Sequence, residues 1–446
     1  MTATKQVEHG PAVRPGPGQP LSAWLSYLES IHHRPIELGL DRIREVAERM
    51  GLLQPNCLTI IVGGTNGKGS TCAMLEAVYL AAGYRVGLST SPHLIDFNER
   101  ARVNGEIASD AALIAHFERV EQARGTTPLT YFEFSTLAIL SLFSESSLDV
   151  MILEVGLGGR LDAVNILDAD CSIITSIDVD HVDWLGSDRE AIGFEKAHIY
   201  RPGRPAICAD PMPPQSLLDY AHQIGADLWR FGHDYNYAGD RQQWNYGGRH
   251  NRRNALAYPA LRGANQLLNA SGALAVVEAL SDRLPVPQQA VRLGLLKVEL
   301  PGRFQILPGQ PTVILDVAHN PHAAAVLADN LGNMGFYPYT HAVFGMLDDK
   351  DIAQVIEKMK GVIDHWHCAT LDVPRGASAQ VLRQKLEAAG VVNGKESSLA
   401  THENVAEAYL AATEQAADGD RIIVFGSFHT VAGVLVHLRN RKVAAS

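Results

Sequence analysis

The residues best suited to chemistry in this sequence form a glycine-rich loop with one lysine. The β-rich run Leu58–Val62 leads into Gly63–Ser70, which reads Gly-Gly-Thr-Asn-Gly-Lys-Gly-Ser, and a helical pattern follows. Glycines let the backbone turn tightly and direct its N–H groups inward, while the helix N-terminus and Lys68 add positive charge. A glycine-rich turn with a chance lysine is the simpler alternative, but the strand before it and the helix after it favour a phosphate-binding loop.

The loop departs from the common form G-x-x-x-x-G-K-[ST] at one position. Gly69 follows Lys68, where a serine or threonine hydroxyl usually binds Mg²⁺. Either Ser70 or a residue elsewhere must therefore bind the metal.

A carboxylate and a histidine follow two further strand-like runs. Glu154 ends the apolar run that begins at Val150, and a carboxylate there is costly to bury without a cation partner. Mg²⁺ prefers such hard oxygen ligands, although a helix-capping or salt-bridged glutamate would also fit. His181 follows the run Ser172–Ile177. Because imidazole is softer than the usual Mg²⁺ ligands, the residues alone favour a hydrogen-bonded structural histidine.

These residues can form one site only if the fold brings the ends of several strands close together. Strand-like and helical patterns alternate from Leu21 to about Leu300, which predicts a doubly wound, mainly parallel sheet with ligands beyond the carboxyl ends of its strands. A second, smaller α/β pattern begins after Pro301. We expect a flexible leader over residues 1–20, a first domain over 21–299 and a second over 300–446. The expected strands are Leu58–Val62, Val86–Ser89, Val150–Leu153, Ser172–Ile177, Thr312–Leu315, Ala342–Phe344 and Ile422–Phe425. The expected helices are Ser70–Ala82, Ala323–Leu331, Ile352–Val362, Ala379–Ala389 and Val405–Ala416, and Asp227–Tyr258 is expected to form loops or an antiparallel excursion.

The composition restricts the class of protein. Hydrophobic residues make up 46% and charged residues 20% of the 446 residues, which is typical of a globular protein of about two domains. The net charge of −11 argues against a nucleic-acid-binding protein. No apolar run reaches the roughly 18–20 residues of a membrane helix, and the first twenty residues lack a signal-like apolar stretch. The five scattered cysteines suit a reducing compartment, so we expect a cytoplasmic protein.

The loop Gly64–Ser70 resembles that of the folylpolyglutamate synthases, relatives of the Mur peptide ligases. The resemblance extends from Leu21 to about Leu438 and is closest to the bacterial bifunctional members, which are also dihydrofolate synthases. It implies a P-loop domain with a mainly parallel sheet and a Rossmann-like C-terminal domain of the glutamate-ligase type. It also implies an ADP-forming, ATP-dependent ligase that adds L-glutamate to 7,8-dihydropteroate and to tetrahydrofolates through an acyl phosphate, acting as a monomer with two Mg²⁺ ions.

The resemblance also assigns roles to individual residues. Ser91, Glu154 and His181 match metal ligands, with a second ion on His181. Lys196 matches a lysine that is carbamylated in the family, although His198 stands where the family usually has glycine; an unmodified, cationic Lys196 is the alternative. The implied catalytic residues are Lys68, Glu154, His181, Lys196 and His319. The implied ATP contacts are Gly64, Thr65, Asn66, Gly67, Lys68, Gly69, Ser70, Asn269, Arg303 and Asp316.

Three segments match those that bind the pterin of dihydropteroate. Aromatic rings can stack on a pterin and a carboxylate can accept its N–H groups, although Tyr131, Phe132 and Phe134 could equally be core residues. Ser427, in Gly426–Thr430, and the loop Gly345–Asp351 are candidates for the glutamate site. The matching pterin residues are Glu37, Leu38, Gly39, Thr130, Tyr131, Phe132, Glu133, Leu161, Asp162 and Ala163.

Three alternative functions stay open. A monofunctional folylpolyglutamate synthase would lack the dihydropteroate reaction. A Mur-type ligase that extends a cell-wall nucleotide shares the chemistry, but the pterin-like segments oppose it. A nucleotide-binding ATPase or regulator without ligase activity needs fewer metal ligands than Glu154, His181 and Asp316 would supply.

Overall fold

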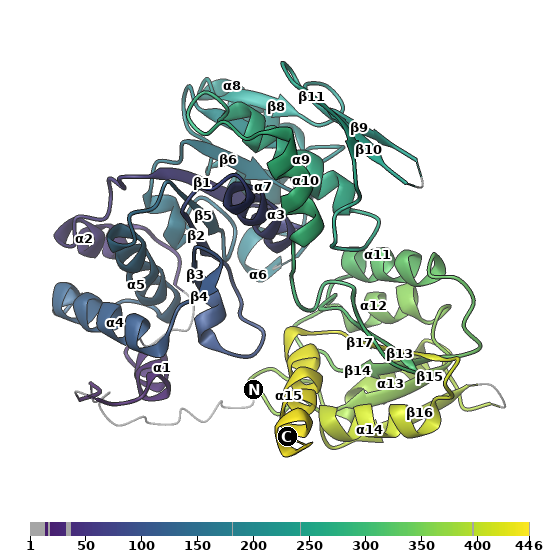
Figure 1. Cartoon of the computed structure of the whole chain (residues 1–446). Coiled ribbons are helices and arrows are strands. Elements are labelled where there is room, and N and C mark those ends of the chain that lie inside the picture. The colour runs from purple at the N-terminus through teal and green to yellow at the C-terminus, as the bar shows by residue number, and fades with distance from the viewer. Residues whose placement is uncertain are drawn as a thin grey trace.

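The computed structural model describes residues 14–16, 18–32, 37–180, 182–240, 242–394 and 397–445, without the side chains of 182, 183 and 442–445. These residues form two α/β lobes, seen in Figure 1 as a purple-to-green first lobe and a lighter green-to-yellow second lobe. The helices are α1 (Leu21–Ser30), α2 (Asp41–Arg49), α3 (Lys68–Ala81), α4 (Asp110–Arg124), α5 (Tyr131–Glu145), α6 (Val182–Leu185), α7 (Arg189–Ala197), α8 (Gln215–Gln223), α9 (Gln266–Ala279), α10 (Gln288–Lys297), α11 (Pro321–Gly332), α12 (Ile352–Met359), α13 (Ala379–Ala388), α14 (Val405–Gln415) and α15 (Phe428–Ala445), with short 3-10 turns η1 (Phe97–Arg100) and η2 (Ala163–Ile166).

The first lobe is built on an eight-stranded sheet. It is parallel except at the edge formed by β3 and β4, where the pairing is antiparallel. This confirms the predicted mainly parallel sheet. In spatial order the strands are β4 (Glu106–Ile107), β3 (Ala101–Val103), β2 (Val86–Ser89), β5 (Val150–Glu154), β1 (Leu58–Gly63), β6 (Cys171–Ile174), β7 (Pro205–Cys208) and β8 (Asp227–Arg230).

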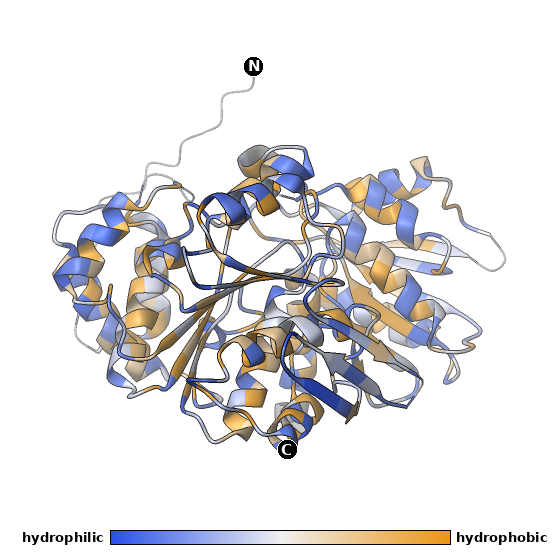
Figure 2. Cartoon of the chain, turned by 90° about the horizontal axis from the view of Figure 1, so that it is seen from above, coloured by the Kyte–Doolittle hydropathy of each residue, from blue (hydrophilic) through white to orange (hydrophobic). Residues whose placement is uncertain are grey.

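Both faces of this sheet are covered by helices. Along β1, Ile60 and Val62 pack with α3, α9 and α10, whereas Ile61 packs with helices on the other face, including α5 and α7. Alternate residues of a strand point to opposite faces, and both faces are buried, which is why the strand reads as an unbroken apolar run. Figure 2 shows the same layering as apolar strands between helices with hydrophilic outer surfaces.

A three-stranded antiparallel ribbon rises from the first lobe. It contains β9 (Asn236–Gly239), β10 (Trp244–Gly247) and β11 (Arg252–Leu256), and Tyr246 of β10 donates from its hydroxyl to Glu278 Oε2 of α9 at 2.7 Å. The predicted antiparallel excursion is thus confirmed for this ribbon. The start of the same stretch differs, because residues 227–230 form the parallel edge strand β8.

The second lobe is built on a six-stranded sheet that is parallel except for the pair β12–β13. Helices α11, α12 and α13 cover one face, and α14 and α15 cover the other. Each strand predicted in this region is present. In spatial order the strands are β12 (Gln305–Leu307), β13 (Thr312–Leu315), β17 (Arg421–Phe425), β14 (Thr340–Phe344), β15 (His365–Ala369) and β16 (Ser398–His402).

The strand predicted at Ser172–Ile177 ends earlier, at Ile174. The reason is that Thr175 turns toward the phosphate loop, where its Oγ1 donates to the carbonyls of Gly63 and Asn66 at 3.1 and 2.7 Å. Asp178 therefore lies in a loop rather than directly after a strand. The predicted helix at 352–362 likewise ends early, at Met359.

Among the described residues, no helix has both the length and the apolar character needed to cross a bilayer.

Candidate active site

Two adjoining cavities lie where the two lobes meet. The first, of about 880 Å³, is lined by the phosphate loop, by the C-terminal end of β5 and by loops of the second lobe. The second, of about 770 Å³, is lined by the first-lobe segments matched to pterin binding. The residues that line both include Ser91, Arg100, Asp180, His319, His322, Lys350 and Arg375.

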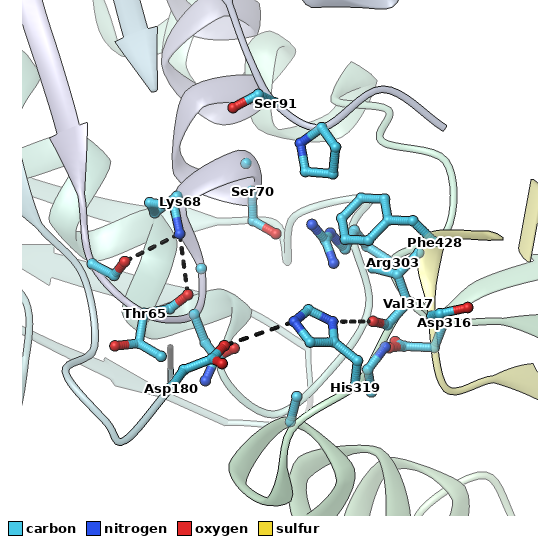
Figure 3. A pocket seen from close by; sticks show the side chains of 18 of the residues that line it. Thr65, Lys68, Ser70, Ser91, Asp180, Arg303, Asp316, Val317, His319 and Phe428 are labelled. Atoms are coloured by element: carbon cyan, nitrogen blue, oxygen red, sulfur yellow. Dashed lines mark hydrogen bonds and ion pairs between the residues drawn. The ribbon is translucent and has the colours of Figure 1, made fainter. Parts of the chain in front are cut away.

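The phosphate loop joins β1 to α3, as predicted. Gly67, with φ of 93°, precedes the helix, and Lys68 begins it. The Lys68 ammonium folds back over the loop and donates to the carbonyls of Gly64 and Thr65 at 3.1 and 3.2 Å (Figure 3). Glycine is required at position 64, because its φ is +135° and a Cβ there would lie 1.8 Å from Thr175 Oγ1.

Glu154 and Ser91 meet in the wall of the first cavity. Glu154 ends β5 with 6% of its surface exposed, and its Oε2 accepts from the backbone N–H of Ser91 at 3.0 Å. Burial raises the pKa of Glu154, whereas Lys68, the Ser91 N–H, Arg303 and Arg100 act to lower it. A carboxylate in this setting needs nearby cations to stay charged. Ser70, the other candidate for the metal, is also buried, and its Oγ accepts from Gln266 Nε2 at 3.4 Å.

Lys196 lies under the phosphate loop, although it comes from α7 rather than from a strand end. Its Nζ donates to the carbonyl of Gly64 at 2.9 Å, and the residue is buried. Burial first, and then the nearby Lys68, lowers the pKa of Lys196 to about 7, while Asp180 and Asp162 act to raise it. This amine is therefore much more easily neutral than an ordinary lysine.

The nucleotide candidates line the opposite side of the first cavity. Asp316 follows β13 and accepts from the N–H groups of Phe304 and Ala318 at 2.9 and 2.8 Å. The guanidinium carbon of the half-buried Arg303 lies 5.1 Å from the centre of the Phe428 ring. Figure 3 shows Arg303, Asp316 and Phe428 across the cavity from Lys68. Asn269 also lines it, from α9, which begins at Gln266.

All three pterin-like segments contribute residues to the lining of the second cavity. They are residues 37–39, 130–133 and 161–163. The first two do not lie at strand ends, which differs from the expectation that ligands bind beyond the carboxyl ends of the strands. Residues 37–39 precede α2, and Thr130 caps α5. They reach the cavity through helix N-termini instead.

Neighbouring residues at the start of α5 point to different places. Phe132 lines the second cavity, whereas Tyr131 does not; its ring packs against Phe97 and lies 5.7 Å from the Arg100 guanidinium carbon. Phe134 is fully buried. The core interpretation therefore holds for Phe134, and Phe132 is the aromatic residue available to a ligand.

Two of the carboxylates that line this cavity, those of Glu133 and Asp162, are already engaged. Glu133 Oε2 accepts from the N–H and hydroxyl of Thr130 in a capping box, and its Oε1 accepts from Arg42 at 3.0 Å. Asp162 accepts from the N–H groups of Leu157 and Val164 at 2.8 and 3.1 Å, and burial raises its pKa to about 6. Both carboxylates therefore organise the backbone around the cavity as well as lining it.

The second lobe presents His319, Lys350 and Ser427. The Nδ1 of His319 lies 2.8 Å from the carbonyl of Val317, and its Nε2 lies 3.8 Å from Asp180 Oδ2 (Figure 3). Lys350 donates to Asp180 Oδ1 at 2.8 Å. Ser427 is buried and caps the first turn of α15, because its Oγ accepts from the N–H of Thr430 at 3.0 Å.

His181, expected to hold a second metal ion, lies outside the described residues. Within the described part of the chain, no three His, Cys, Asp or Glu side chains are grouped closely enough to bind a metal by themselves. Of the three predicted metal ligands, Ser91 and Glu154 lie within the described residues, and both offer oxygen atoms. Mg²⁺ commonly binds one or two protein oxygens and completes its shell with phosphate and water, so this pair fits that ion.

Sequence reasoning did not single out Arg100 or Asp180. Arg100 lines both cavities, and its Nε donates to His93 Nδ1 at 2.9 Å. Asp180 links the lobes through Lys350. Arg100 belongs to no glycine-rich or strand-end pattern, and Asp180 stands beside His181 in a strand-end segment where only the histidine was selected. Only the folded chain reveals that both line the two cavities.

Comparison with known proteins places the chain in a family. Residues 62–277 match the Mur ligase middle domain, and residues 302–428 match the Mur ligase glutamate ligase domain. A dihydrofolate synthase/folylpolyglutamate synthase of Escherichia coli is 47% identical over 96% of this chain and 98% of its own length. The one from Haemophilus influenzae is 43% identical over 93% of this chain and 96% of its own.

Solved structures of similar proteins point to the same family. Escherichia coli FolC in complex with DHPP and ADP superposes with a TM-score of 0.90 at 45% identity, covering 96% of this chain and 100% of its own. A bifunctional folylpolyglutamate synthase/dihydrofolate synthase with Mn, AMPPNP and L-glutamate bound superposes with a TM-score of 0.87 at 46% identity, covering 95% of this chain and 99% of its own. The chain therefore belongs to the Mur ligase family, as a glutamate ligase of the dihydrofolate synthase/folylpolyglutamate synthase group.

Proposed function

We propose that this chain uses ATP to join L-glutamate to both 7,8-dihydropteroate and tetrahydrofolates, at the junction of its two cavities. One observation carries the proposal: the cavity of the phosphate loop and the cavity of the pterin-like segments share a wall that contains Ser91, Arg100 and Lys350. A nucleotide in the first and an acceptor in the second would meet there. The relatives bound to DHPP with ADP, and to AMPPNP with L-glutamate, are consistent with this division.

ATP would bind with its phosphates on Thr65–Lys68 and its base toward Asn269. Lys68 supplies a cation that folds over the loop, and the backbone N–H groups at the start of α3 add partial positive charge. Arg303 and Asp316 would contact the nucleotide from the second lobe. In an acidic protein of net charge −11, this local concentration of positive charge allows three anionic substrates to meet.

Ser91 and Glu154 would hold Mg²⁺, and His181 a second ion. Such an ion neutralises charge between the phosphates and the acceptor carboxylate. The Ser91 N–H fixes one oxygen of Glu154, which leaves the carboxylate oriented by the protein before any ligand arrives. Carbamylation of Lys196 would add a negative charge beside this centre; its position under Gly64 and its lowered pKa support the modification.

The reaction would proceed in two steps. The acceptor carboxylate oxygen attacks the γ-phosphorus, the bond to ADP breaks, and an acyl phosphate forms. The amine of L-glutamate, having lost a proton, then attacks the acyl carbon, and inorganic phosphate leaves as the amide forms. Lys68 and Arg100 would stabilise the developing negative charge. His319 and Ser427, at the second-lobe wall, would position the incoming glutamate, and contact between the lobes would exclude water from the acyl phosphate.

The test is phosphate release combined with mass spectrometry of the products. With ATP, dihydropteroate and L-glutamate the chain should yield ADP, phosphate and dihydrofolate in equal amounts, and with tetrahydrofolate it should yield the γ-glutamyl product. A nucleotide-binding ATPase would release phosphate without acceptor or glutamate. A Mur-type ligase would require a cell-wall nucleotide, and a monofunctional enzyme would leave dihydropteroate unchanged.

A cytoplasmic location is supported by the five cysteines, all of which are free thiols. The monomeric state stays a prediction, which size-exclusion chromatography with light scattering would check.

A further inference from the structure

The side chain of Asn66, in the phosphate loop, is held by the second lobe. Its Oδ1 accepts from Asn320 Nδ2 at 3.1 Å, and its Nδ2 lies 2.9 Å from His322 Nδ1. Asn320 and His322 stand at the start of α11, so both partners come from one helix N-terminus. With Nδ1 of His322 accepting, its ring proton lies on Nε2.

The main chain of Asn66 is held by the first lobe. Its carbonyl accepts from Thr175 Oγ1 at 2.7 Å and from Ser176 Oγ at 3.1 Å. The next residue, Gly67, turns the chain into α3 and has a left-handed backbone conformation. Asn66 is therefore the one phosphate-loop residue, within the described contacts, whose backbone is fixed by one lobe and whose side chain is fixed by the other.

Further contacts tie the same residues together. Asn320 Nδ2 also lies 3.4 Å from Asp180 Oδ2, and Asp180 accepts from Lys350 of the second lobe. The backbone of Asp178 exchanges two hydrogen bonds of 3.0 Å with Thr65 Oγ1 of the phosphate loop. The loop, the segment after β6 and the start of α11 thus form one connected network.

We propose that Asn320 and His322 are positioning residues that couple closure of the lobes to the geometry of the phosphate loop, through Asn66. This rests on the proposed ligase function and deepens it. The contacts exist only when the lobes meet and the loop has its present shape. By reciprocity, ATP that favours this loop shape favours closure, and closure favours ATP by the same free energy. The lobes then stay closed while the acyl phosphate exists, which protects it from water.

The first test replaces Asn320 with serine. The present Asn320 Oδ1 caps α11 by accepting from the N–H of Ala323 at 2.9 Å, and serine is an equally good N-cap that is too short to reach Asn66. His322→Phe keeps a ring and removes the nitrogen. Losing one net hydrogen bond should raise the KM for ATP about three- to tenfold. It should also release more phosphate than ligated product, because acyl phosphate is lost to water.

Arg439→Ala is the matched control. It removes an ion pair between the lobes, Arg439 with Asp96, that is exposed and lies outside both cavities. Exposed pairs contribute little, so the KM for ATP and the ratio of product to phosphate should stay at wild-type values. A double-mutant cycle of Asn66→Ala with Asn320→Ser isolates the contact itself. The double variant should lose less than the sum of the losses in the two single variants.

The coupling is wrong if folded Asn320→Ser and His322→Phe both keep the wild-type KM for ATP and the wild-type ratio of product to phosphate. It is also wrong if Arg439→Ala is impaired equally. An additive double-mutant cycle would contradict it as well. Thermal unfolding identifies a variant that fails to fold, and the other variant then decides. The ligase proposal fails separately, when the wild-type chain makes no product from glutamate. In that case the affinity for AMPPNP in the same variants still tests the coupling, with a three- to tenfold loss expected from the same hydrogen bond.

Discussion

Lys196 Nζ donates to the carbonyl of Gly64 at 2.9 Å, which places a buried amine directly beneath the phosphate loop. The two residues are 132 positions apart, and α7 brings them together. Burial first, and then Lys68, lowers the pKa of Lys196 to about 7. Carbamate formation requires a neutral amine, so this contact and this pKa bear on the modification that we propose.

Bicarbonate should activate the enzyme, and more strongly as the pH rises. Below a pKa of about 7 the amine of Lys196 is mainly protonated and cannot react with CO₂, whereas above it the neutral form dominates. Turnover measured after removal of CO₂ should therefore fall, and its recovery with bicarbonate should increase between about pH 6 and pH 8. Mass spectrometry under native conditions should detect the added CO₂.

Chemical rescue of Lys196→Ala distinguishes the carbamate from a plain ammonium. If the carbamate is required, acetate or formate should partly restore turnover and a small amine should not. Rescue by the amine alone would show that Lys196 acts as a cation that pairs with the loop or phosphate. A variant at the exposed Lys358, which lies outside both cavities, should respond to neither additive and is the control.

Glu154→Gln should leave a folded protein that binds its metal more weakly and needs more Mg²⁺ for turnover. The amide keeps the shape but loses the charge, so the affinity for Mg²⁺ should fall by at least about tenfold. Magnesium titration of turnover measures this, and thermal unfolding checks the fold. An unchanged apparent Mg²⁺ constant would mean that Glu154 is not a ligand.

Lys68→Ala should reduce turnover at least about 100-fold, because it removes the cation that folds over the phosphate loop. Steady-state kinetics with saturating ATP measures the loss. Lys68→Arg restores the charge but not the geometry, and it should recover little. Near-wild-type turnover in the alanine variant would mean that this loop does not bind the phosphates of ATP.

Phe132→Ala should weaken binding of the acceptor more than binding of the nucleotide. The ring lines only the second cavity, so the KM for dihydropteroate should rise several-fold to about tenfold while the KM for ATP stays the same. Tyr131→Phe is the matched control, because that ring packs outside the cavity and keeps its contact with Phe97. An equal rise in the KM for both substrates would mean that Phe132 supports the structure of the whole site and does not contact the acceptor specifically.

Gly294→Ala should destabilise the first lobe by roughly 1–3 kcal/mol. A Cβ at this position of α10 would lie 2.6 Å from the Cα of Val78 in α3, the helix that begins at Lys68. Gly332→Ala, at the end of α11, meets nothing within 4 Å and should leave stability unchanged or slightly higher. Thermal unfolding of the two variants tests whether this close contact of helices is required.

Much of the fold followed from local patterns. The alternation of strand and helix predicted both lobes, and the glycines around Lys68 predicted the phosphate loop, because backbone conformation near glycine and apolar periodicity are local properties. The end of β6 was wrong by three residues. Its cause, the hydrogen bonds from Thr175 to Gly63 and Asn66, lies more than a hundred positions away in the chain.

The resemblance supplied candidate residues, and the tertiary structure decided where each side chain lies. The sequence could not separate Phe132, which lines the acceptor cavity, from Tyr131, because successive residues at a helix start point in different directions that only packing fixes. The residue types, their local elements and the family were determined by the sequence itself. The partners of Asn66, the pair of Lys350 with Asp180 and the amine of Lys196 under Gly64 were decided only by the folded chain, because each contact joins segments that are distant in sequence.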